Sequence, residues 1–288
     1  MGTLFKSEEA YREYDHFYNN SLQLFELEHA SLYVPTRFGD THVLRFGDLS
    51  KKPLVLLHGM TMSSTMWYPN MKRLAKDRCV YAVDVMGDFG RSKPVAAIKS
   101  KDEAVNWLLD VMDGLKMNET DMAGHSMGGF LAMIFALANQ ERVSKLVLYA
   151  PAGTFHRMSM KFFAKIYPAL LFHTDKWIDR AFAWFSGTGE PLHPVFRDQI
   201  IAGYSHAKPQ LQVMPGFLPK EHFTSFKRPV LLLIGDKEVI YPAQKAIANA
   251  RSVIPHVEAH VISGANHALT MEHADEVNEL TAAFLRHG

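Results

Sequence analysis

The chain has 288 residues, a hydrophobic fraction of 48%, and 31 Lys and Arg against 30 Asp and Glu. This length accommodates one large α/β domain, or a core domain with an inserted subdomain. The balanced charge gives no electrostatic footprint for nucleic acid or for an anionic membrane surface, so we expect a small-molecule or protein partner. The single cysteine, Cys79, excludes an internal disulfide, and its strand-like surroundings predict a buried, unreactive thiol.

The N-terminal stretch lacks the apolar run of a signal peptide, and Lys6 stands where a myristoylation motif needs Ser or Thr. No run approaches the length of about 18 apolar residues that a membrane span needs, so we expect a cytoplasmic protein without a span. Residues 7–28 have helical spacing, which predicts an outer helix within an N-terminal helical extension over 1–30. Residues 36–47 then predict a hairpin of two short strands around Gly39 and Asp40.

From residue 53 onward, short apolar runs alternate with segments of helical spacing. The predicted strands cover 53–59, 79–84, 121–126, 145–151, 229–235 and 256–262, and the predicted helices cover 64–76, 101–116, 127–140 and 242–251. Continuous apolar runs are typical of strands that are covered on both faces, as in a parallel sheet. The alternation therefore predicts a doubly wound α/β core built from residues 31–151 and 229–288.

The alternation is interrupted over residues 152–228. The first half of this segment has a helical pattern rich in Phe, Trp and Met, and the second half is rich in loops and prolines. We interpret it as an inserted, mainly helical cap over an apolar pocket. Each aromatic residue is more often part of a core than of a pocket wall, and the sequence does not say which ones point inward. The candidates to line the pocket are Phe155, Phe162, Phe163, Trp177, Trp184 and Phe217.

One short motif indicates the chemistry. Residues 124–128, GHSMG, match G-x-S-x-G and lie between a predicted strand and a predicted helix. At such a turn the serine is strained and exposed, small flanking residues let neighbouring backbone pass, and the helix N-terminus offers free N–H groups. Ser126 is therefore the predicted nucleophile. The alternative interpretation is a glycine-rich helix start with Ser126 as its N-cap.

The sequence His58-Gly59-Met60 directly follows the first of the predicted parallel strands. In folds of this kind, the loop after an early strand gives one backbone N–H to an oxyanion hole, and the residue after the nucleophile gives another. We expect Met60 and Met127 to be these donors, through the main chain only. His58 is expected to hold the loop in shape, without a role in proton transfer.

Fifteen histidines compete for the role of general base. The base has to lie beside Ser126, in a loop at the same end of the sheet, and after the acid in chain order. His267 lies in a short loop between the last predicted strand and the final helix, whereas His260 lies in that strand and His273 in the helix. His267 is therefore the predicted base.

The acid that orients the imidazole has to follow a strand end close to the histidine loop. The segment after residues 145–151 carries no Asp or Glu, which leaves the stretch IGDKEVIYP at 234–242. Both Asp236 and Glu238 lie in this stretch. Asp236 directly follows the strand end, and a short acid there also commonly accepts backbone hydrogen bonds in the turn. From these residues alone the choice between the two acids stays open.

Several segments together resemble the α/β-hydrolase superfamily from about residue 30 to the C-terminus: HGM (58–60), DVMGDFGRS (84–92), GHSMGG (124–129), GDKEVIYP (235–242) and GANHALTMEH (264–273). Residues 67–92 and 104–115 are similar to bacterial serine carboxylesterases of the naproxen-type group, which cleave esters of bulky aryl-propionic acids. The resemblance implies an acid three residues after Gly235 and four before Pro242, which is Glu238. The superfamily more commonly has Asp there, but Ser–His–Glu triads also occur in it, and Asp236 stays the rival.

The resemblance implies a serine carboxylesterase that uses no metal or organic cofactor and acts on a small, apolar or aromatic ester. The serine at the elbow disfavours dehalogenase and epoxide hydrolase chemistry, which use Asp there. Carbon–carbon bond hydrolase, lactonase, thioesterase and perhydrolase activities are alternatives on the same triad. A ligand receptor or scaffold on this fold is the alternative from another class, and the complete triad argues against a silent site. The oligomeric state is left open.

Overall fold

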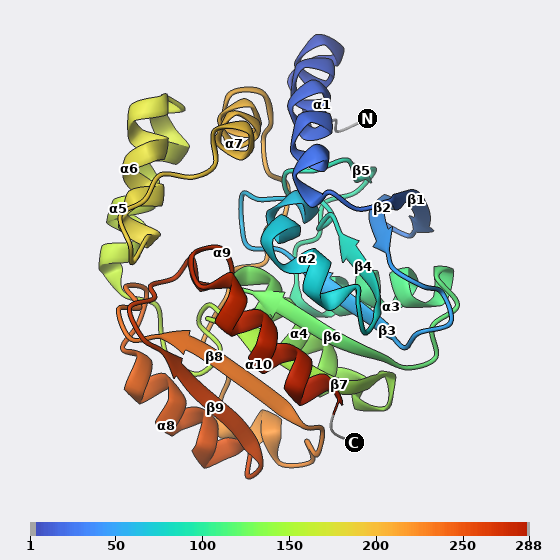
Figure 1. The fold of residues 1–288 in the computed structure, drawn as a ribbon, viewed down its shortest axis with the longest axis vertical. Helices are drawn as coiled ribbons and strands as arrows, with labels where there is room; N and C mark the ends of the chain where they lie inside the picture. Colours follow the sequence, from blue (N-terminus) through green and yellow to red (C-terminus); the bar gives the residue numbers. More distant parts are fainter. Residues whose placement is uncertain (1–3, 287–288) are drawn as a thin grey trace.

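The computed structural model describes residues 4–286 and is built around one mixed sheet (Figure 1). The strand order is β1-β2-β4-β3-β6-β7-β8-β9, and β5 pairs with β2 at the side. The strands are β1 (His29–Thr36), β2 (Gly39–Phe46), β3 (Pro53–Leu57), β4 (Cys79–Val83), β5 (Lys93–Pro94), β6 (Thr120–His125), β7 (Val143–Tyr149), β8 (Val230–Gly235) and β9 (Val257–Ile262). From β4 to β9 all neighbouring strands are parallel, which confirms the predicted mostly parallel fold.

The first hairpin differs from the prediction. Strands β1 and β2 pair antiparallel up to the pair Thr36 and Gly39, so Arg37 and Phe38 form the turn. Gly39 already belongs to β2, with a φ of 126°, and a Cβ there would collide with the Lys93 carbonyl oxygen of β5. The prediction of a turn around Gly39 and Asp40 is therefore wrong. The glycine is needed because β5 approaches β2 closely at that point.

Helices cover both faces of the sheet, over two separate apolar clusters. Val55 and Leu57 of β3 belong to the cluster under α3, α4 and α8, whereas Leu54 and Leu56 belong to the cluster under α2 and α10. Because alternate residues of a strand face opposite sides, both sets are buried and the strand is apolar throughout. The core helices are α2 (Tyr68–Leu74), α3 (Lys101–Gly114), α4 (Met127–Ala138), α8 (Ala243–Val253), α9 (Leu269–Glu272) and α10 (Ala274–Arg286), with 3-10 turns η1 (Gln23–Phe25), η2 (Ser64–Trp67), η3 (Gln140–Arg142) and η4 (Lys220–Phe223).

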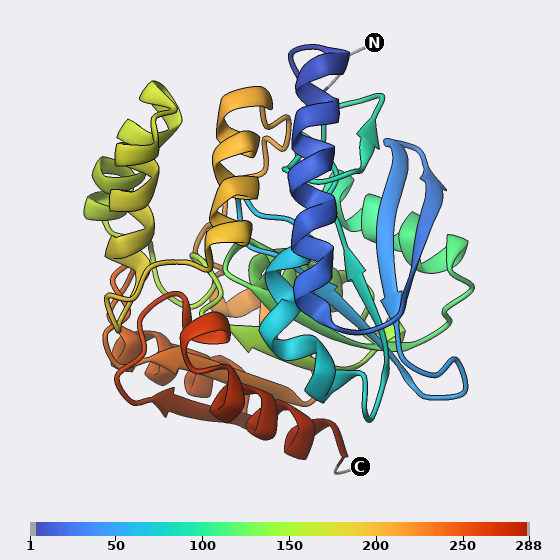
Figure 2. The ribbon, with the colours of Figure 1, turned by 45° about the horizontal axis from the view of Figure 1, so that its top comes forward.

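The inserted segment forms three helices, α5 (Met160–Phe172), α6 (Asp175–Phe185) and α7 (Pro194–His206). Helices α5 and α6 lie side by side, and α7 lies next to the N-terminal helix α1 (Glu8–Leu22) (Figures 1 and 2). Arg197 of α7 also pairs with Asp175 and Asp179 of α6. Gln199 of α7 donates to the Tyr14 hydroxyl of α1 at 3.1 Å. The insertion is thus divided into an α5–α6 pair and an α7 that packs on α1. The domain limits at 30, 151 and 228 stay a prediction.

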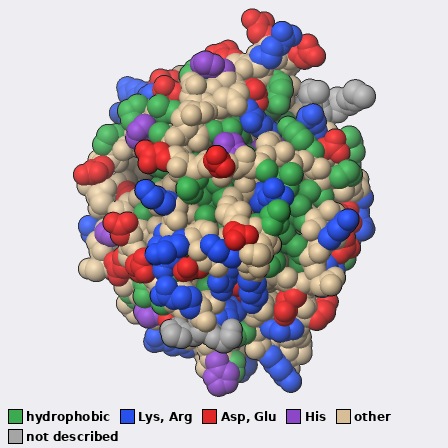
Figure 3. Space-filling model, turned by 45° about the vertical axis from the view of Figure 1, so that its right-hand side comes forward, with side chains coloured by type: hydrophobic (Ala, Val, Ile, Leu, Met, Phe, Trp, Pro, Cys, Tyr) green, Lys and Arg blue, Asp and Glu red, His purple; other side chains and the backbone are tan. Residues whose placement is uncertain are grey.

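The surface reflects the balanced composition. Acidic and basic side chains lie close together over much of the face seen in Figure 3. Cys79 is buried in β4, as predicted. Among residues 4–286, no helix has both the length and the apolar character needed to cross a membrane.

Candidate active site

Ser126 lies at the sharp turn between β6 and α4. Its φ of 52° and ψ of −114° place it in a region that costs a non-glycine residue on the order of 1–3 kcal/mol. The Ser126 N–H donates to the Tyr149 carbonyl at 2.9 Å, and its own carbonyl accepts from the Ala152 N–H at 3.0 Å. A Cβ at Gly124 would collide with the Gly128 carbonyl oxygen, so the flanking glycines are needed for the turn to close. The strained elbow expected from the motif is present.

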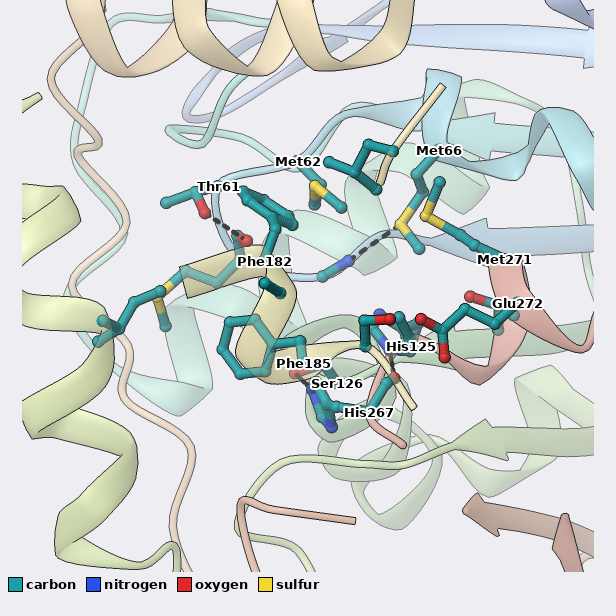
Figure 4. Close-up of a pocket in the computed structure, with 18 of the residues that line it drawn as sticks. Thr61, Met62, Met66, His125, Ser126, Phe182, Phe185, His267, Met271 and Glu272 are labelled. Atoms are coloured by element: carbon teal, nitrogen blue, oxygen red, sulfur yellow. Dashed lines mark hydrogen bonds between the residues drawn. The ribbon is translucent and has the colours of Figure 1, made fainter. Parts of the chain in front are cut away.

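A continuous line of hydrogen bonds runs from Ser126 through His267 to Glu238. His267, in the loop between β9 and α9, has its Nε2 2.8 Å from Ser126 Oγ (Figure 4 shows both side chains). Its Nδ1 lies 2.8 Å from Glu238 Oε2. The Glu238 side chain is fully buried and that of His267 is 6% exposed. Donation from Nδ1–H to the carboxylate leaves Nε2 free to accept the serine proton. The arrangement can therefore remove the proton from Ser126.

The two acids of the stretch 234–242 have different surroundings. The second oxygen of Glu238, Oε1, accepts the Ile240 N–H at 2.8 Å, which fixes the carboxylate against the imidazole. Asp236 is exposed, and its Oδ1 accepts the Gly264 N–H at 2.9 Å, a contact that joins the loops after β8 and β9. The extra methylene of glutamate thus spans the gap to His267, while Asp236 makes the turn contact that is common for a short acid.

The loop after β3 has three neighbouring backbone N–H groups with different partners. The Gly59 N–H donates to Met66 Sδ at 3.5 Å, and the Thr61 N–H donates to both carboxylate oxygens of Asp88, at 3.1 and 3.0 Å. Within residues 4–286, the Met60 N–H between them has no acceptor, and neither has the Met127 N–H at the start of α4. Both residues line the same cavity as Ser126. These two free donors fit the expected oxyanion hole.

Two buried side chains anchor this loop. His58 donates from Nδ1 to the Gly59 carbonyl and accepts the Val85 N–H at Nε2, each at 2.8 Å. Burial lowers the pKa of His58, which favours the neutral ring that this pair of bonds requires. Burial raises the pKa of Asp88 to about 7, although the backbone N–H groups it accepts oppose that shift. His58 therefore makes the contacts expected of a structural residue, and Asp88 is an anchor that sequence reasoning missed.

Asn266 connects the triad to the cap. Its Oδ1 accepts the N–H groups of Val239, at 3.1 Å, and of His267, at 2.8 Å. Its Nδ2 donates to the carbonyls of Trp184, at 3.0 Å, and Ser186, at 3.2 Å, at the end of α6. A buried amide can make at most four hydrogen bonds of this kind, and Asn266 makes all four. It therefore fixes the acid loop, the base loop and one edge of the cap relative to one another.

His125 lies next to the nucleophile and beneath the base. Its Nε2 donates to the His267 carbonyl at 2.8 Å, and its Nδ1, buried near Gly59, has no hydrogen-bond partner among the described residues. Burial and the nearby His267 lower the pKa of His125 to about 3. The His125 ring is therefore neutral at ordinary pH, and its hydrogen bond to the His267 carbonyl holds the His267 loop in place.

Ser126 and His267 open into a cavity of about 590 Å³ between the sheet and the cap. Six methionines line it, namely Met60, Met62, Met66, Met127, Met158 and Met271. Phe162 of α5 and Phe182 and Phe185 of α6 form much of the cap side (Figure 4 shows the last two). Methionine side chains are flexible and polarizable, so this lining can adapt to aromatic as well as aliphatic groups.

Of the six aromatic residues predicted to line the pocket, only Phe162 is among the cavity residues. Phe155 is buried against Phe223, and Trp177 stacks on Phe172 with ring centroids 5.9 Å apart. The remaining three also lie outside the lining: Phe163 and Phe217 are exposed and Trp184 packs against the core. Phe182 and Phe185, which do line the cavity, were missed. Their spacing of three residues on one helix face was the available signal.

Comparisons with known proteins identify the family of this chain. The model of the family described as "Alpha/beta hydrolase family" matches residues 54–280 of this chain. The uncharacterized carboxylesterase nap of Bacillus subtilis is 37% identical over 273 residues, covering 93% of this chain and 90% of the relative. The carboxylesterase YbfK of the same organism is 34% identical over 277 residues, covering 93% of this chain and 92% of the relative.

A solved structure extends the similarity to the whole fold. The crystal structure of naproxen esterase (carboxylesterase NP) from Bacillus subtilis superposes with a TM-score of 0.91 at 36% identity, covering 98% of this chain and 100% of that one. The match includes the cap as well as the sheet, because nearly the whole of both chains is covered. The predicted fold and the predicted resemblance are both confirmed: the chain belongs to the alpha/beta hydrolase family of enzymes.

Proposed function

We propose that this enzyme is a serine carboxylesterase in which Ser126 is the nucleophile, His267 the base and Glu238 the orienting acid. The observation that carries the proposal is the pair of 2.8 Å contacts that joins the three side chains beside a cavity. The carboxylesterase names of the relatives at 37% and 34% identity support the same activity.

In the first half of the reaction, His267 Nε2 takes the Ser126 proton while Oγ attacks the ester carbonyl carbon. The carbonyl oxygen becomes an oxyanion, and the free N–H groups of Met60 and Met127 donate to it. Collapse of the tetrahedral intermediate breaks the bond to the alcohol oxygen, which receives the proton from Nε2. The alcohol departs and the acyl group remains on Ser126.

In the second half, His267 takes a proton from a water molecule that attacks the acyl carbon. The resulting tetrahedral intermediate uses the same two N–H donors, and its collapse returns the proton from Nε2 to Ser126 Oγ. The Glu238 carboxylate holds Nδ1–H throughout and stabilises the imidazolium that forms twice per cycle. A carboxylic acid is released, and the enzyme returns to its starting state.

The substrate is an apolar or aromatic ester of small size. The lining of the cavity of about 590 Å³ contains six methionines, three phenylalanines and one isoleucine, together with the charged residues Asp179, Glu190, Arg197 and Glu272. Its apolar part is as expected for a site that recognises apolar groups. The similarity to naproxen esterase, at 36% identity over nearly the whole chain, supports an aromatic acid as one acceptable acyl group.

The test combines turnover with active-site labelling. The protein should hydrolyse nitrophenyl esters, and a fluorophosphonate probe should label Ser126, as read by mass spectrometry of the digested protein. Ser126→Ala should lose both the label and on the order of 10⁴–10⁶-fold of kcat. Labelling of Ser126 without turnover of any ester in an acyl-chain series would contradict the esterase assignment and favour a receptor. Turnover of a diketone in place of esters would instead favour a carbon–carbon bond hydrolase.

A further inference from the structure

Helix α5 has apolar side chains on two opposite sides. Phe162 and Ile166 point into the cavity. On the other side, Met160, Phe163, Tyr167, Leu171 and Phe172 are exposed and form what we term the outer face of α5; Met160 is 79% exposed, Tyr167 63% and Phe172 55%. The first four lie three or four residues apart, so they share one stripe of the helix. A contiguous apolar stripe of this size on a surface marks an interaction site.

Basic residues outnumber acidic ones in the segment that contains α5. Residues 156–180 contain five Lys and Arg against two Asp, whereas the whole chain is nearly neutral. Both acids, Asp175 and Asp179, are already paired with Arg197 of α7, at 3.3 and 2.7 Å. In the described part of the chain, no salt bridge involves Lys161 or Lys165, which are exposed beside the stripe. Residues 156–180 therefore have a local excess of positive charge, although the total charge of the chain is close to zero.

This combination distinguishes between possible occupants of the stripe. A second copy related by a two-fold axis would bring the same stripe and the same lysines against each other, with no acid on α5 to neutralise them. An anionic lipid surface offers apolar chains to the stripe and phosphate groups to the lysines at the same time. The aromatic side chains of Phe163, Tyr167 and Phe172 suit the boundary between headgroups and acyl chains.

We propose that the outer face of α5 docks on an anionic lipid surface, and that the enzyme takes apolar esters that partition into that surface. The part concerning substrate rests on the esterase activity proposed above, whereas the docking itself does not. The same helix lines the cavity with Phe162 and Ile166. One helix therefore carries both the lipid-facing stripe and part of the cavity wall, which places the cavity close to the docked surface.

Flotation with vesicles tests the docking. The full chain should float with vesicles made of equal parts phosphatidylcholine and phosphatidylglycerol, bind pure phosphatidylcholine more weakly, and lose binding as salt is raised. The double variant Leu171→Ser/Phe172→Ser should bind the anionic vesicles at least about tenfold more weakly, because it removes two apolar contacts. Lys161→Glu/Lys165→Glu should lose the preference for anionic vesicles, also by about tenfold or more.

The chain offers a matched control away from α5. Leu49 and Val95 are 64% and 74% exposed, and Leu49→Ser/Val95→Ser should bind vesicles as the wild type does. All variants should hydrolyse a soluble nitrophenyl ester at the wild-type kcat/KM, which shows that they are folded. Failure of the wild type to float with anionic vesicles would overturn the docking. So would a dimer, seen by light scattering, that Leu171→Ser/Phe172→Ser dissociates while vesicle binding is unchanged.

The two proposals fail in different ways. Vesicle binding with no ester turnover would remove the esterase proposal and leave the docking in place. Ester turnover with no vesicle binding would remove the docking alone. If both hold, hydrolysis of a membrane-partitioned ester should rise when anionic vesicles carry it, and Leu171→Ser/Phe172→Ser should lose that rise while keeping its rate on the soluble ester.

Discussion

The loops that carry the triad and the α5–α6 pair of the cap are held in different ways. Around His267, directional hydrogen bonds account for the geometry: Glu238 uses both carboxylate oxygens and Asn266 uses all four of its hydrogen-bonding positions. The α5–α6 pair packs mainly through aromatic and aliphatic contacts. Hydrogen bonds fix distances, whereas apolar contacts tolerate changes of shape. The triad loops and the α5–α6 pair are thus separate parts of the molecule that are constrained in different ways.

The largest effect is expected in the triad loops, from replacing Glu238 rather than the other acid, Asp236. Glu238→Ala should lower kcat by about 10³–10⁴-fold, because the imidazole loses its orientation and its counter-charge. Asp236→Ala should change kcat by less than about tenfold, because it removes one exposed hydrogen bond to Gly264. Steady-state kinetics with a nitrophenyl ester, with circular dichroism as the folding control, provides the measurement. A larger loss in Asp236→Ala than in Glu238→Ala would reverse the assignment.

The sequence predicts features that are set by short segments of the chain better than contacts between distant segments. Glu238 lies three residues after Gly235, at the position that the resemblance to the α/β-hydrolase superfamily implies for the acid, whereas the residues alone left Asp236 and Glu238 as alternatives. The strand end, the elbow and the histidine loop are likewise set by short segments with strong patterns. The partners of Asn266 lie some 80 residues away, at Trp184 and Ser186. No local pattern indicates a contact of that range, so the sequence could not predict it.

Removing Asn266 would break the connection between the two parts. Asn266→Ala should lower kcat by about 10–10²-fold, since loss of the bonds to Val239 and His267 lets the base move by a fraction of an ångström. Asn266→Asp keeps the acceptor for those two N–H groups but loses the donors to the cap. It should therefore retain more of kcat than Asn266→Ala while raising KM for bulky esters. Equal losses in both variants, with KM unchanged, would mean that Asn266 does not link cap and base.

The aromatic residues of the cap explain the remaining failure of sequence reasoning. Adjacent residues on a helix point in different directions, so the choice between Phe162 and Phe163 depends on how α5 is rotated against the sheet. That rotation is set by apolar packing across the fold, which composition and spacing do not specify. Five of the six predicted pocket residues do not line the cavity. Helix rotation accounts for Phe163, Trp177 and Trp184, whereas Phe155 and Phe217 lie in loops whose course the sequence does not specify.

The same adjacent pair offers a smaller test in the cap. Phe162→Ala should raise KM for an aromatic acyl ester by up to about tenfold with little change in kcat, because it removes an apolar contact made equally in ground and transition states. Phe163→Ala is the matched control, since Phe163 is exposed and does not line the cavity. An effect of Phe163→Ala on KM as large as that of Phe162→Ala would show that the helix is rotated from the position described.

The smallest effect concerns acid stability, because two buried groups near the triad act in opposite directions. The pKa of His125 is lowered to about 3 and that of Asp88 is raised to about 7. On acidification below about pH 6.5, unfolded His125 binds a proton that the folded state refuses, so the free energy of unfolding falls. Folded Asp88 binds a proton that the unfolded state takes only below about pH 4, so the free energy of unfolding rises over the same range.

Between about pH 6.5 and pH 4.5, the contributions of His125 and Asp88 to the pH dependence of the free energy of unfolding largely cancel in the wild type. Replacing one of the two residues should therefore reveal the contribution of the other. Asp88→Asn should lose stability on acidification by up to about 1.4 kcal/mol per pH unit more than the wild type, and His125→Asn should lose correspondingly less. Urea unfolding at both pH values measures the slopes, which are independent of the constant cost of each substitution. Parallel slopes in all three proteins would show that acid does not act on the triad loops. In that case the stability of this end of the sheet would rest, like that of the cap, on contacts that pH leaves unchanged.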